Sequence, residues 1–573
     1  MNKNYNSYYI LGCTFYSQGN YHKAEKYFKK AIALNTRFAP AYNDLGNIYK
    51  NTHDYQNALK YYLKALRYLP QSAIILTNLG VIQNHLENPH LAVKYFERAV
   101  ESDPNYFEAY YGLGVACYNA DLGEKAIDAL QKTVKLNPNF THANSFLTFL
   151  KMQTCDWNNI PKYDPLTDSP ILSVFRFDDP KINFETALLW SSFVENKMTG
   201  YPKFVHKKRK KKKLTVGYLS NDFYNHATAY LTNGLFALHN KNEFTVNIYS
   251  YGPSEKNYYL DKFKKEADNF VDISKMSDYQ AAEKIYSDNV DILVDLKGFT
   301  GGSRMEILAA KPAPIQVTWL GFPGTTGARF IDYIITDRII SPGADQKYCS
   351  EKFAYMPNTY QINDADRKIA SKKYTREDFG LPEKGIIFCC FNRPTKIEPK
   401  AFGAWITILK KVPGSVLWLW KDNDLMVRNL KKEALKARVD PARLVFGDNL
   451  PNEKHLARLR LADLALDTFV YNGHTTTSDC LWAGVPVITL KGKHFASRVS
   501  ASLLTAIGLP ELITHSQKEY ESLAIELATN PKKLGAIHES LILNRESCPL
   551  FDTKLFVKNL EELYKEIGQN YIK

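Results

Sequence analysis

One stretch decides the fold: Asp467-Thr-Phe-Val-Tyr-Asn-Gly-His-Thr-Thr-Thr-Ser-Asp-Cys-Leu-Trp-Ala-Gly-Val-Pro486. The apolar run Leu464–Leu466 comes just before it and predicts a buried strand. Gly473 predicts a turn, and a helical pattern follows with Leu481 and Trp482 on its inner side. The stretch therefore predicts a strand, a turn and a helix in succession.

The start of this predicted helix is rich in hydroxyl groups. Thr475–Ser478 occupy the positions at which hydroxyl side chains cap a helix best. The first turn of a helix also offers unpaired N–H groups and about half a positive charge, which suits a phosphate group. Asp479 lies a turn further on and could accept a hydrogen bond from a ribose hydroxyl. The alternative is a well-capped turn without a ligand, but His474 has little structural work to do there, which favours a ligand site.

Length and charge set the limits of the interpretation. The chain has 573 residues, enough for about three or four domains, and a net charge of +14 that suits acidic ligands or partners. Much of this charge lies in the run His206–Lys213, which we interpret as a solvated linker, with nuclear import or nucleic-acid contact as alternatives. Because the excess charge is so localised, nucleic acid is the least expected partner.

The eight cysteines contain no CxxC pair, and Cys389 and Cys390 sit in an apolar run. We therefore expect free buried thiols, no zinc site and a reducing compartment, which is the cytoplasm. No apolar stretch approaches the roughly 18 residues of a membrane span, so none is expected.

The first 150 residues repeat with a period of 34. This spacing is that of tetratricopeptide repeats and predicts a short helical solenoid over residues 1–150. Small residues would let paired helices cross closely, and the aromatic residues would fill the gaps. Such a surface binds peptides or partner proteins; the alternative is a structural cap. The positions that carry the repeat are Gly12, Gly46, Gly80 and Gly114, then Ala24, Ala58, Ala92 and Ala126, then Phe28, Tyr62, Phe96 and Leu130.

After the repeats the pattern changes twice. Residues 151–213 are rich in proline and predict a connector with one helix near Phe184–Lys197. Two sets of strands alternating with helices follow, at 214–375 and 376–573, and they predict two parallel α/β domains facing a cleft. The candidate strands are Leu214–Leu219, Phe244–Tyr249, Ile292–Val294, Ile315–Trp319 and Tyr333–Ile335, then Ile386–Phe388, Val416–Trp420, Leu444–Phe446, Leu464–Leu466 and Val487–Thr489.

Ligands in such sheets lie beyond the carboxyl ends of the strands, so the loops after the strands are where chemistry is expected. These loops are Ser220–His226, Leu320–Gly324, Asn392–Lys396 and the Asp467 stretch.

Together with the repeats, these loops resemble the protein O-GlcNAc transferase family. The motifs of the match are Asn472-Gly-His-Thr-Thr476, Leu320-Gly-Phe-Pro-Gly-Thr325, Lys311-Pro-Ala-Pro-Ile-Gln316 and Leu481-Trp-Ala-Gly484. The resemblance covers nearly the whole chain and implies a tetratricopeptide solenoid followed by a GT-B fold of two Rossmann-like domains. It implies an inverting, metal-independent enzyme that moves a sugar, GlcNAc first among the candidates, from a UDP-sugar to Ser or Thr hydroxyls of proteins, with no further cofactor.

The same resemblance assigns roles to residues. Lys396 matches the diphosphate-binding lysine, with Arg393 beside it. Thr475–Thr476 at the helix start would hold the diphosphate, and His474 the sugar or diphosphate. His226 matches the active-site histidine, whose role is base or positioning. The metal-binding pattern Asp-x-Asp occurs at 364–366 and 422–424, but in polar, loop-like sequence, where we expect solvated acids and no metal.

The remaining assignments concern the nucleoside and the sugar. His455 would lie against the uracil, with Arg458 beside the base, and Asp479 would contact the ribose. The loop that lines the sugar pocket would contain Leu320, Gly321 and Pro323.

Several positions depart from the family's animal members. Arg393 replaces a glutamine, Asn452 a ribose-contacting lysine, and Thr477 a glycine. Tyr471 replaces a small residue near the N-acetyl pocket, which keeps glucose open as the donor sugar. The few repeats and the absence of an intervening domain between the two α/β halves are typical of bacterial members.

Two other classes of function stay open at this stage. One is a scaffold protein in which the solenoid binds partners and the α/β domains form a non-catalytic sugar-nucleotide module. The other keeps the enzyme but transfers the sugar to a lipid or a glycan.

Overall fold

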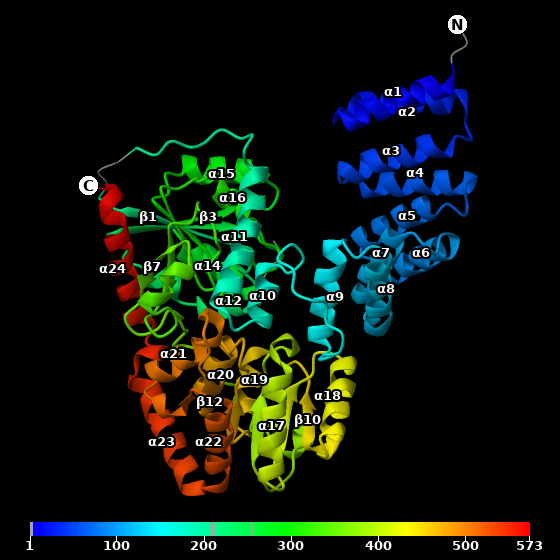
Figure 1. The fold of residues 1–573 in the computed structure, drawn as a ribbon. Coiled ribbons are helices and arrows are strands. Elements are labelled where there is room, and N and C mark those ends of the chain that lie inside the picture. The colour runs from blue at the N-terminus through cyan, green and yellow to red at the C-terminus, as the bar shows by residue number, and fades with distance from the viewer. Residues whose placement is uncertain (1–3, 208–211, 254, 256, 573) are drawn as a thin grey trace. The chain divides into compact units, whose positions relative to one another are not determined.

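The structure is a computed structural model that describes residues 4–207, 212–253, 255 and 257–572. The chain forms two compact units, which divide between Lys151 and Met152 (Figure 1). Residues 208–211 of the predicted basic run lie outside the described part of the chain. Among the described residues, no helix has the length and apolar character needed to cross a membrane.

The first unit is a series of antiparallel helix pairs, as the repeat predicts. The regular spacing of small and aromatic residues has a direct steric cause: a Cβ on Gly12 would lie 2.5 Å from the ring of Phe28, and Gly46 stands in the same relation to Tyr62. The tetratricopeptide prediction is confirmed. The helices are α1 Tyr5–Ser17, α2 Tyr21–Leu34, α3 Ala39–Asn51, α4 Tyr55–Tyr68, α5 Ala73–His85, α6 Pro89–Ser102, α7 Phe107–Asn119 and α8 Gly123–Leu136, followed by α9 Thr141–Gln153.

The connector is more ordered than the sequence indicated. It contains two helices, α10 (Pro170–Arg176) and α11 (Pro180–Lys197), each with proline in the first turn, where a missing N–H costs nothing. It belongs to the second unit, within which Trp157 Nε1 donates to the carbonyl of Ile397 at 3.1 Å. Helix α10 was not predicted, because seven residues are too few for a helical period to show.

The second unit contains two parallel sheets, as predicted. The first has the order β3-β2-β1-β4-β5-β6-β7, and the second β10-β9-β8-β11-β12-β13. The first-sheet strands are β1 Leu214–Ser220, β2 Phe244–Ser250, β3 Asn269–Asp272, β4 Ile292–Asp295, β5 Ile315–Thr318, β6 Tyr333–Thr336 and β7 Lys352–Tyr355. The second-sheet strands are β8 Ile387–Cys390, β9 Val416–Trp420, β10 Leu444–Gly447, β11 Leu464–Leu466, β12 Val487–Leu490 and β13 Ile513–Thr514.

The central strands were predicted and the edge strands β3, β7 and β13 were not. Central strands such as β4 and β8 are buried along their whole length, so they stand out as apolar runs. The edge strand β3 has exposed ends, and β13 has only two residues. Such strands are defined by pairing to a neighbour rather than by their own composition.

Helices lie between the strands and cover the sheets (Figure 1). Those of the first half are α12 Ala227–Leu231, α13 Leu235–Leu238, α14 Tyr258–Glu266, α15 Asp278–Ser287 and α16 Met305–Ala309. Those of the second half are α17 Pro399–Lys411, α18 Asp424–Lys436, α19 Asn452–Leu459, α20 Thr475–Ala483, α21 Val499–Ala506, α22 Gln517–Thr529 and α23 Pro531–Ser547, and the last is α24 Thr553–Ile572.

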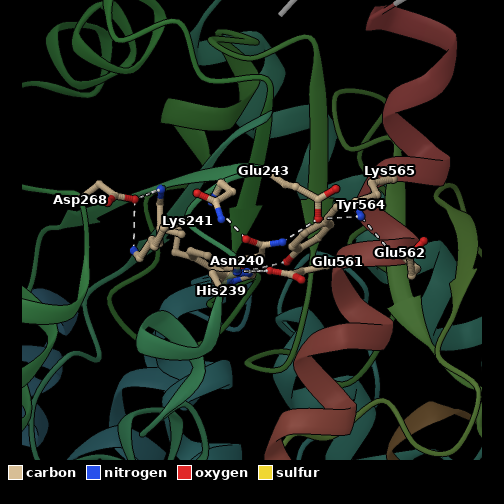
Figure 2. A network of polar contacts seen from close by, with 12 residues as sticks. His239, Asn240, Lys241, Glu243, Asp268, Glu561, Glu562, Tyr564 and Lys565 are labelled. Atoms are coloured by element: carbon tan, nitrogen blue, oxygen red, sulfur yellow. Dashed lines mark hydrogen bonds and ion pairs between the residues drawn. The ribbon is translucent and has the colours of Figure 1, made fainter. Parts of the chain in front are cut away.

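Helix α24 returns to the first sheet and packs near α13 and β7 (Figure 1). Figure 2 shows the polar network that holds it. The Glu561 carboxylate accepts from the backbone N–H of Asn240 at 2.7 Å and lies 3.1 Å from His239 Nδ1. The Tyr564 hydroxyl lies 3.1 Å from that of Tyr218, on β1. The last helix thus joins the two α/β halves, a return that the sequence pattern gave no sign of.

The strand orders locate the candidate site. The order reverses between β1 and β4 in the first sheet and between β8 and β11 in the second. Ligands of open α/β sheets bind at such switch points, beyond the carboxyl ends of the strands. The loops after β1, β8 and β11 carry His226, Lys396 and the Asp467 stretch respectively.

Candidate functional site

The turn before α20 is built around the buried carboxylate of Asp467. This side chain accepts from the N–H of Gly473 at 2.6 Å, from that of Thr468 at 2.9 Å and from Asn392 Nδ2 at 3.1 Å. A Cβ on Gly473 would lie 2.3 Å from Thr477 Oγ1, so only glycine leaves room for the helix to start here. The loops after β8 and β11 are thereby fixed to each other.

The hydroxyl groups at the start of α20 do not cap it, contrary to the sequence interpretation. The N-cap residue is His474, and within the described residues the cap makes no side-chain hydrogen bond. Thr476 Oγ1 instead donates to Asn392 Oδ1 at 2.5 Å, and Thr477 Oγ1 lies 2.8 Å from Ser500 Oγ. These bonds anchor the helix start to its neighbours while its first-turn N–H groups stay available for an anion.

Lys396 lies beside this helix start. It ends a 3-10 helix, Pro394–Lys396, and its Nζ donates to the carbonyl of Asn472 at 2.8 Å. The ammonium group also lies 4.1 Å from the centre of the Tyr471 ring. Burial lowers the pKa of Lys396 to about 7; the negative charge of Asp467 opposes this shift and Arg393 adds to it. An anion placed here would favour the charged form of this amine and raise its pKa.

An aromatic stack lies beside Lys396. The Tyr471 ring is buried between Phe175, at 4.6 Å, and His474, at 4.8 Å. His474 Nε2 lies 3.4 Å from the carbonyl of Ala496. Burial, with the nearby charge of Lys396, lowers the pKa of His474 well below its usual value, so the ring is neutral at pH 7. Phe175 belongs to α10, so the connector takes part in this site.

The predicted uracil position contains a linked pair. Arg458 is buried, and its Nε donates to His455 Nδ1 at 3.0 Å. Its guanidinium lies 4.6 Å from the centre of the Phe391 ring, which also contacts His455 edge-on. Burial lowers the pKa of His455 to about 4, although Asp479 opposes the shift. A neutral His455 that accepts at Nδ1 carries its proton on Nε2 and can donate to a base carbonyl.

Asp479, the predicted ribose contact, is buried and paired. Its carboxylate forms an ion pair with Arg367, which lies in the segment between the two sheets. Arg367 Nη2 also approaches Asn452 Oδ1 at 3.4 Å. Arg367 was not among the predicted site residues, since nothing near it in sequence distinguishes it from a surface arginine.

His226 lies after β1, as predicted, and caps α12. Its Nδ1 accepts from the N–H of Thr228 at 3.3 Å and lies 3.5 Å from Asp222. Asp222 is buried in an ion pair of 2.8 Å with Lys297. Burial lowers the pKa of His226; Asp222 opposes the shift, and Lys297 and Arg393 add to it. The charge of Arg393, from the second sheet, thus acts on a histidine of the first.

The loop after β5 also approaches the Asp467 stretch. Leu320 has a φ of 72°, and a Cβ on Gly321 would lie 2.0 Å from the carbonyl oxygen of Leu296. Gly321 is therefore required by a close backbone approach. Pro323 is buried, and the neighbouring Phe322 packs in one cluster with Tyr471. The predicted sugar-pocket loop and the helix start are thus brought together.

In each Asp-x-Asp pattern the first acid binds a neighbouring side chain and the second is exposed. Asp364 is buried and accepts from Asn233 Nδ2 at 2.6 Å, so the expectation of a solvated acid was wrong there. Asp422 accepts from Gln153 Nε2 at 2.9 Å. Asp366 and Asp424 are exposed, as expected. Among the described residues no group of three or more His, Cys, Asp and Glu side chains is arranged to hold a metal ion.

Other site residues could have been found from the sequence only in part. Lys297 follows β4 just as the predicted loops follow their strands, so its position was a usable signal. Asn392 and Asp467 lay inside stretches already singled out. Their contacts with each other depend on the alignment of two strands that are far apart in sequence.

A helical repeat unit followed by two parallel sheets, with cations and a helix start at their switch points, defines a tetratricopeptide protein with paired nucleotide-binding-type α/β domains. The chain belongs to glycosyl transferase family 41, whose model matches residues 193–374 and 367–560. Tetratricopeptide repeat models match residues 5–38, 37–105 and 85–139.

Relatives and a solved structure agree with this placement. A probable UDP-N-acetylglucosamine–peptide N-acetylglucosaminyltransferase of Arabidopsis thaliana, SEC, is 42% identical over 359 residues, covering 62% of this chain and 37% of that protein. A UDP-N-acetylglucosamine–peptide N-acetylglucosaminyltransferase of Caenorhabditis elegans is 30% identical over 471 residues, covering 63% of this chain and 41% of that protein. The chain thus spans about two fifths of the length of these curated relatives.

The structure of a Thermobaculum terrenum O-GlcNAc transferase mutant superimposes with a TM-score of 0.70 and 25% sequence identity. It covers 93% of this chain and 98% of that one. The similarity therefore includes the helical repeats as well as both α/β halves.

Proposed function

We propose that this protein is an inverting, metal-independent glycosyltransferase that moves GlcNAc from UDP-GlcNAc to Ser or Thr hydroxyls of proteins. The observation that carries the proposal is that Lys396 lies beside the start of α20. Its Nζ donates to the carbonyl of Asn472, in the turn that leads into this helix. The relatives named as peptide N-acetylglucosaminyltransferases support the choice of donor and acceptor.

The chemistry requires a fixed positive environment. When a nucleotide sugar reacts, negative charge grows on the oxygen of the leaving diphosphate, and preorganised cations and dipoles stabilise it most effectively in a site shielded from water. Lys396, Arg393 and the uncapped start of α20 supply such groups. Lys396 takes up a proton when the diphosphate arrives, because the anion raises its pKa.

The geometry favours a positioning role for His226. Its Nδ1 already accepts from the N–H of Thr228, so the neutral ring carries its proton on Nε2 and acts as a hydrogen-bond donor. A donor is suited to hold a substrate oxygen, whereas a general base needs a free acceptor nitrogen.

Glucose is the second candidate for the donor sugar, because Tyr471 is a large residue beside His474 and Lys396. A panel of UDP-GlcNAc, UDP-glucose and UDP-galactose, each radiolabelled and incubated with cell lysate, ranks the donors. We expect most label from UDP-GlcNAc; a larger signal from UDP-glucose would replace the donor in the proposal.

The acceptor is tested on the same product. Protease should release the label if it is on protein, while resistance to protease with solubility in organic solvent would indicate a lipid. We propose that the tetratricopeptide unit contributes to binding the acceptor protein. UDP binding by calorimetry without any transfer of label would instead support a non-catalytic sugar-nucleotide module.

Metal independence has its own test. Label transfer should be unchanged by millimolar EDTA, and loss of transfer that manganese restores would overturn this part of the proposal. The reaction is proposed to take place in the cytoplasm; each of the eight cysteines lies among the described residues, and each is a free thiol.

A further inference from the structure

Arg367 has more hydrogen-bond donors than the protein uses. Its side chain is nearly fully buried, with 8% of the residue exposed, and a guanidinium carries five N–H groups in a fixed fork. Nη2 pairs with Asp479 and approaches Asn452. Nε and Nη1 are buried and have no hydrogen-bond partner among the described residues.

In a second arginine–aspartate pair of the same unit, each nitrogen of the guanidinium has a hydrogen-bond partner. Arg304 Nε donates to Asp278 at 2.7 Å, Nη1 to the carbonyl of Ile273 at 3.0 Å, and Nη2 to that of Met276 at 2.7 Å. Buried polar groups are normally paired in this way, since an unpaired one costs free energy. The unpaired groups of Arg367 therefore call for a partner that is not part of the chain.

The position of Arg367 indicates which partner. Trp482 Nε1, on α20, donates to the carbonyl of Arg367 at 3.1 Å and holds its backbone. The guanidinium lies between Asn452, at the start of α19, and Asp479, in α20. The charges of Arg367 and Asp479 both affect the pKa of His455, in the second half, and the pKa of Tyr230, in α12 of the first half. Arg367 thus lies where both sheets face the predicted nucleoside.

The chemistry of the pair matches a vicinal diol. Each ribose hydroxyl can donate one hydrogen bond and accept others. Asp479 offers only acceptor oxygens, and Arg367 offers only N–H donors. A diol placed against both can therefore donate to the carboxylate and accept from the guanidinium at the same time. A neutral diol is also compatible with an ion pair whose two charges already balance.

We propose that Arg367 is a specificity-determining residue that donates from Nε and Nη1 to the ribose hydroxyls of the donor nucleotide, with Asp479 accepting from them. The inference rests on the proposed function, because it takes a UDP-sugar as the ligand. It assigns a donor-binding role to the segment that connects the two sheets.

The experiment compares UDP with 2′-deoxy-UDP and 3′-deoxy-UDP by calorimetry. Arg367→Lys keeps the positive charge opposite Asp479 but removes the planar fork, and Arg304→Lys makes the same change in a pair that the protein satisfies itself. We expect Arg367→Lys to bind UDP about ten- to a hundredfold more weakly, as for the loss of one or two hydrogen bonds with a charged partner. Its preference for UDP over at least one deoxy nucleotide should disappear, while Arg304→Lys behaves as the wild type.

The outcomes separate this inference from the proposed function. If the wild-type protein does not bind UDP, the proposed function fails first. If it binds UDP but Arg367→Lys binds equally well, or loses affinity equally for all three nucleotides, Arg367 has only a structural role and the inference is overturned. If Arg367→Lys unfolds below the assay temperature, Arg367→Gln takes its place, because glutamine also lacks the planar fork of N–H donors.

One alternative location is tested at the same time. Arg367 also lines a cavity of about 470 Å³, together with Arg460, Arg545 and Trp482. Arg460→Met removes a cation from that cavity but not from the Asp479 pair. Unchanged UDP affinity in Arg460→Met is expected, and a loss equal to that of Arg367→Lys would place the nucleotide in the cavity and overturn the inference.

Discussion

At the scale of single residues, the site depends on charges held in positions shielded from water. Lys396 is the main example, because burial, together with the charge of Arg393, lowers its pKa to about 7 although Asp467 opposes the shift. Its ammonium group is held by the carbonyl of Asn472 and by the Tyr471 ring rather than by a carboxylate. Such a cation loses little when an anionic ligand replaces its contacts.

Replacing Lys396 tests its role in the proposed glycosyl transfer. Lys396→Met should lower turnover by about 10²–10³, the effect of removing one preorganised group that stabilises charge in a transition state. Circular dichroism and the melting temperature should stay close to wild type, since the methionine chain fills the same space. Turnover within twofold of wild type would remove Lys396 from the mechanism.

The pKa of Lys396 also predicts a pH effect on ligand binding. Above pH 7 the free protein holds this amine mostly neutral, and the bound diphosphate raises its pKa, so binding takes up a proton. At pH 8 we expect uptake of about 0.9 proton per UDP, and an affinity that falls about tenfold per pH unit above 7. Calorimetry in buffers of different ionisation enthalpy measures the uptake.

Lys396→Met is the control for this pH effect, because it leaves the other ionisable groups in place. The variant should bind UDP without proton uptake at pH 8. Equal uptake by both proteins would assign the proton to another group and contradict the low pKa of Lys396.

At the scale of elements, the start of α20 is the part of the site that tolerates least change. Gly473 has no room for a Cβ, and the hydroxyls of Thr476 and Thr477 already bind Asn392 and Ser500. The helix start is thus fixed by its neighbours from two sides, which keeps its N–H groups aimed at one place.

Gly473→Ala should therefore impair UDP binding by displacing the first turn of α20. The added Cβ meets Thr477 Oγ1 and Thr476 Oγ1 at 2.3 and 2.8 Å, so these side chains must move. We expect a loss of affinity of at least tenfold, measured by calorimetry. Gly403→Ala is the matched control: it lies in α17 with open space around it, and it should leave binding unchanged and stabilise the fold by about 0.5–1 kcal/mol.

At the scale of the whole molecule, the two α/β halves are tied by the return of α24. The network around Glu561 joins residues more than 300 positions apart in sequence (Figure 2). Burial raises the pKa of Glu561, but hydrogen bonds from His239 and the Asn240 N–H outweigh it, and the net effect lowers the pKa below 4.5. The carboxylate therefore stabilises the fold in its charged form.

Glu561→Ala should cost about 1–3 kcal/mol of unfolding free energy at pH 7, because it leaves the buried His239 ring and the N–H of Asn240 without this partner. Since the folded pKa is lowered, this contribution is fully present above pH 4.5 and is lost as the pH falls through the folded pKa. The difference between variant and wild type in urea unfolding should shrink below pH 4.5. Glu562→Ala, an exposed neighbour, should stay within about 0.5 kcal/mol of wild type at every pH.

The sequence by itself determined the repeats, the two parallel sheets and the loops that the strands place at the candidate site. The repeats can be predicted from glycines that face aromatic rings at a fixed period, and the central strands from their fully apolar runs. Both signals lie within short stretches of sequence. The loops that hold His226, Lys396 and Asp479 were found because parallel strands place their carboxyl ends at one edge. Each of these features needs only neighbours in sequence or a common rule of sheet geometry.

Only the tertiary structure decided the partners of these groups. The hydroxyls of α20 bind Asn392 and Ser500 instead of capping the helix, Phe175 of the connector stacks on Tyr471, and Arg367 pairs with Asp479. These contacts join segments that lie 23 to 296 residues apart. A pairing across such distances depends on how the elements pack, and the pKa of a buried group depends on the charges that this packing brings near it.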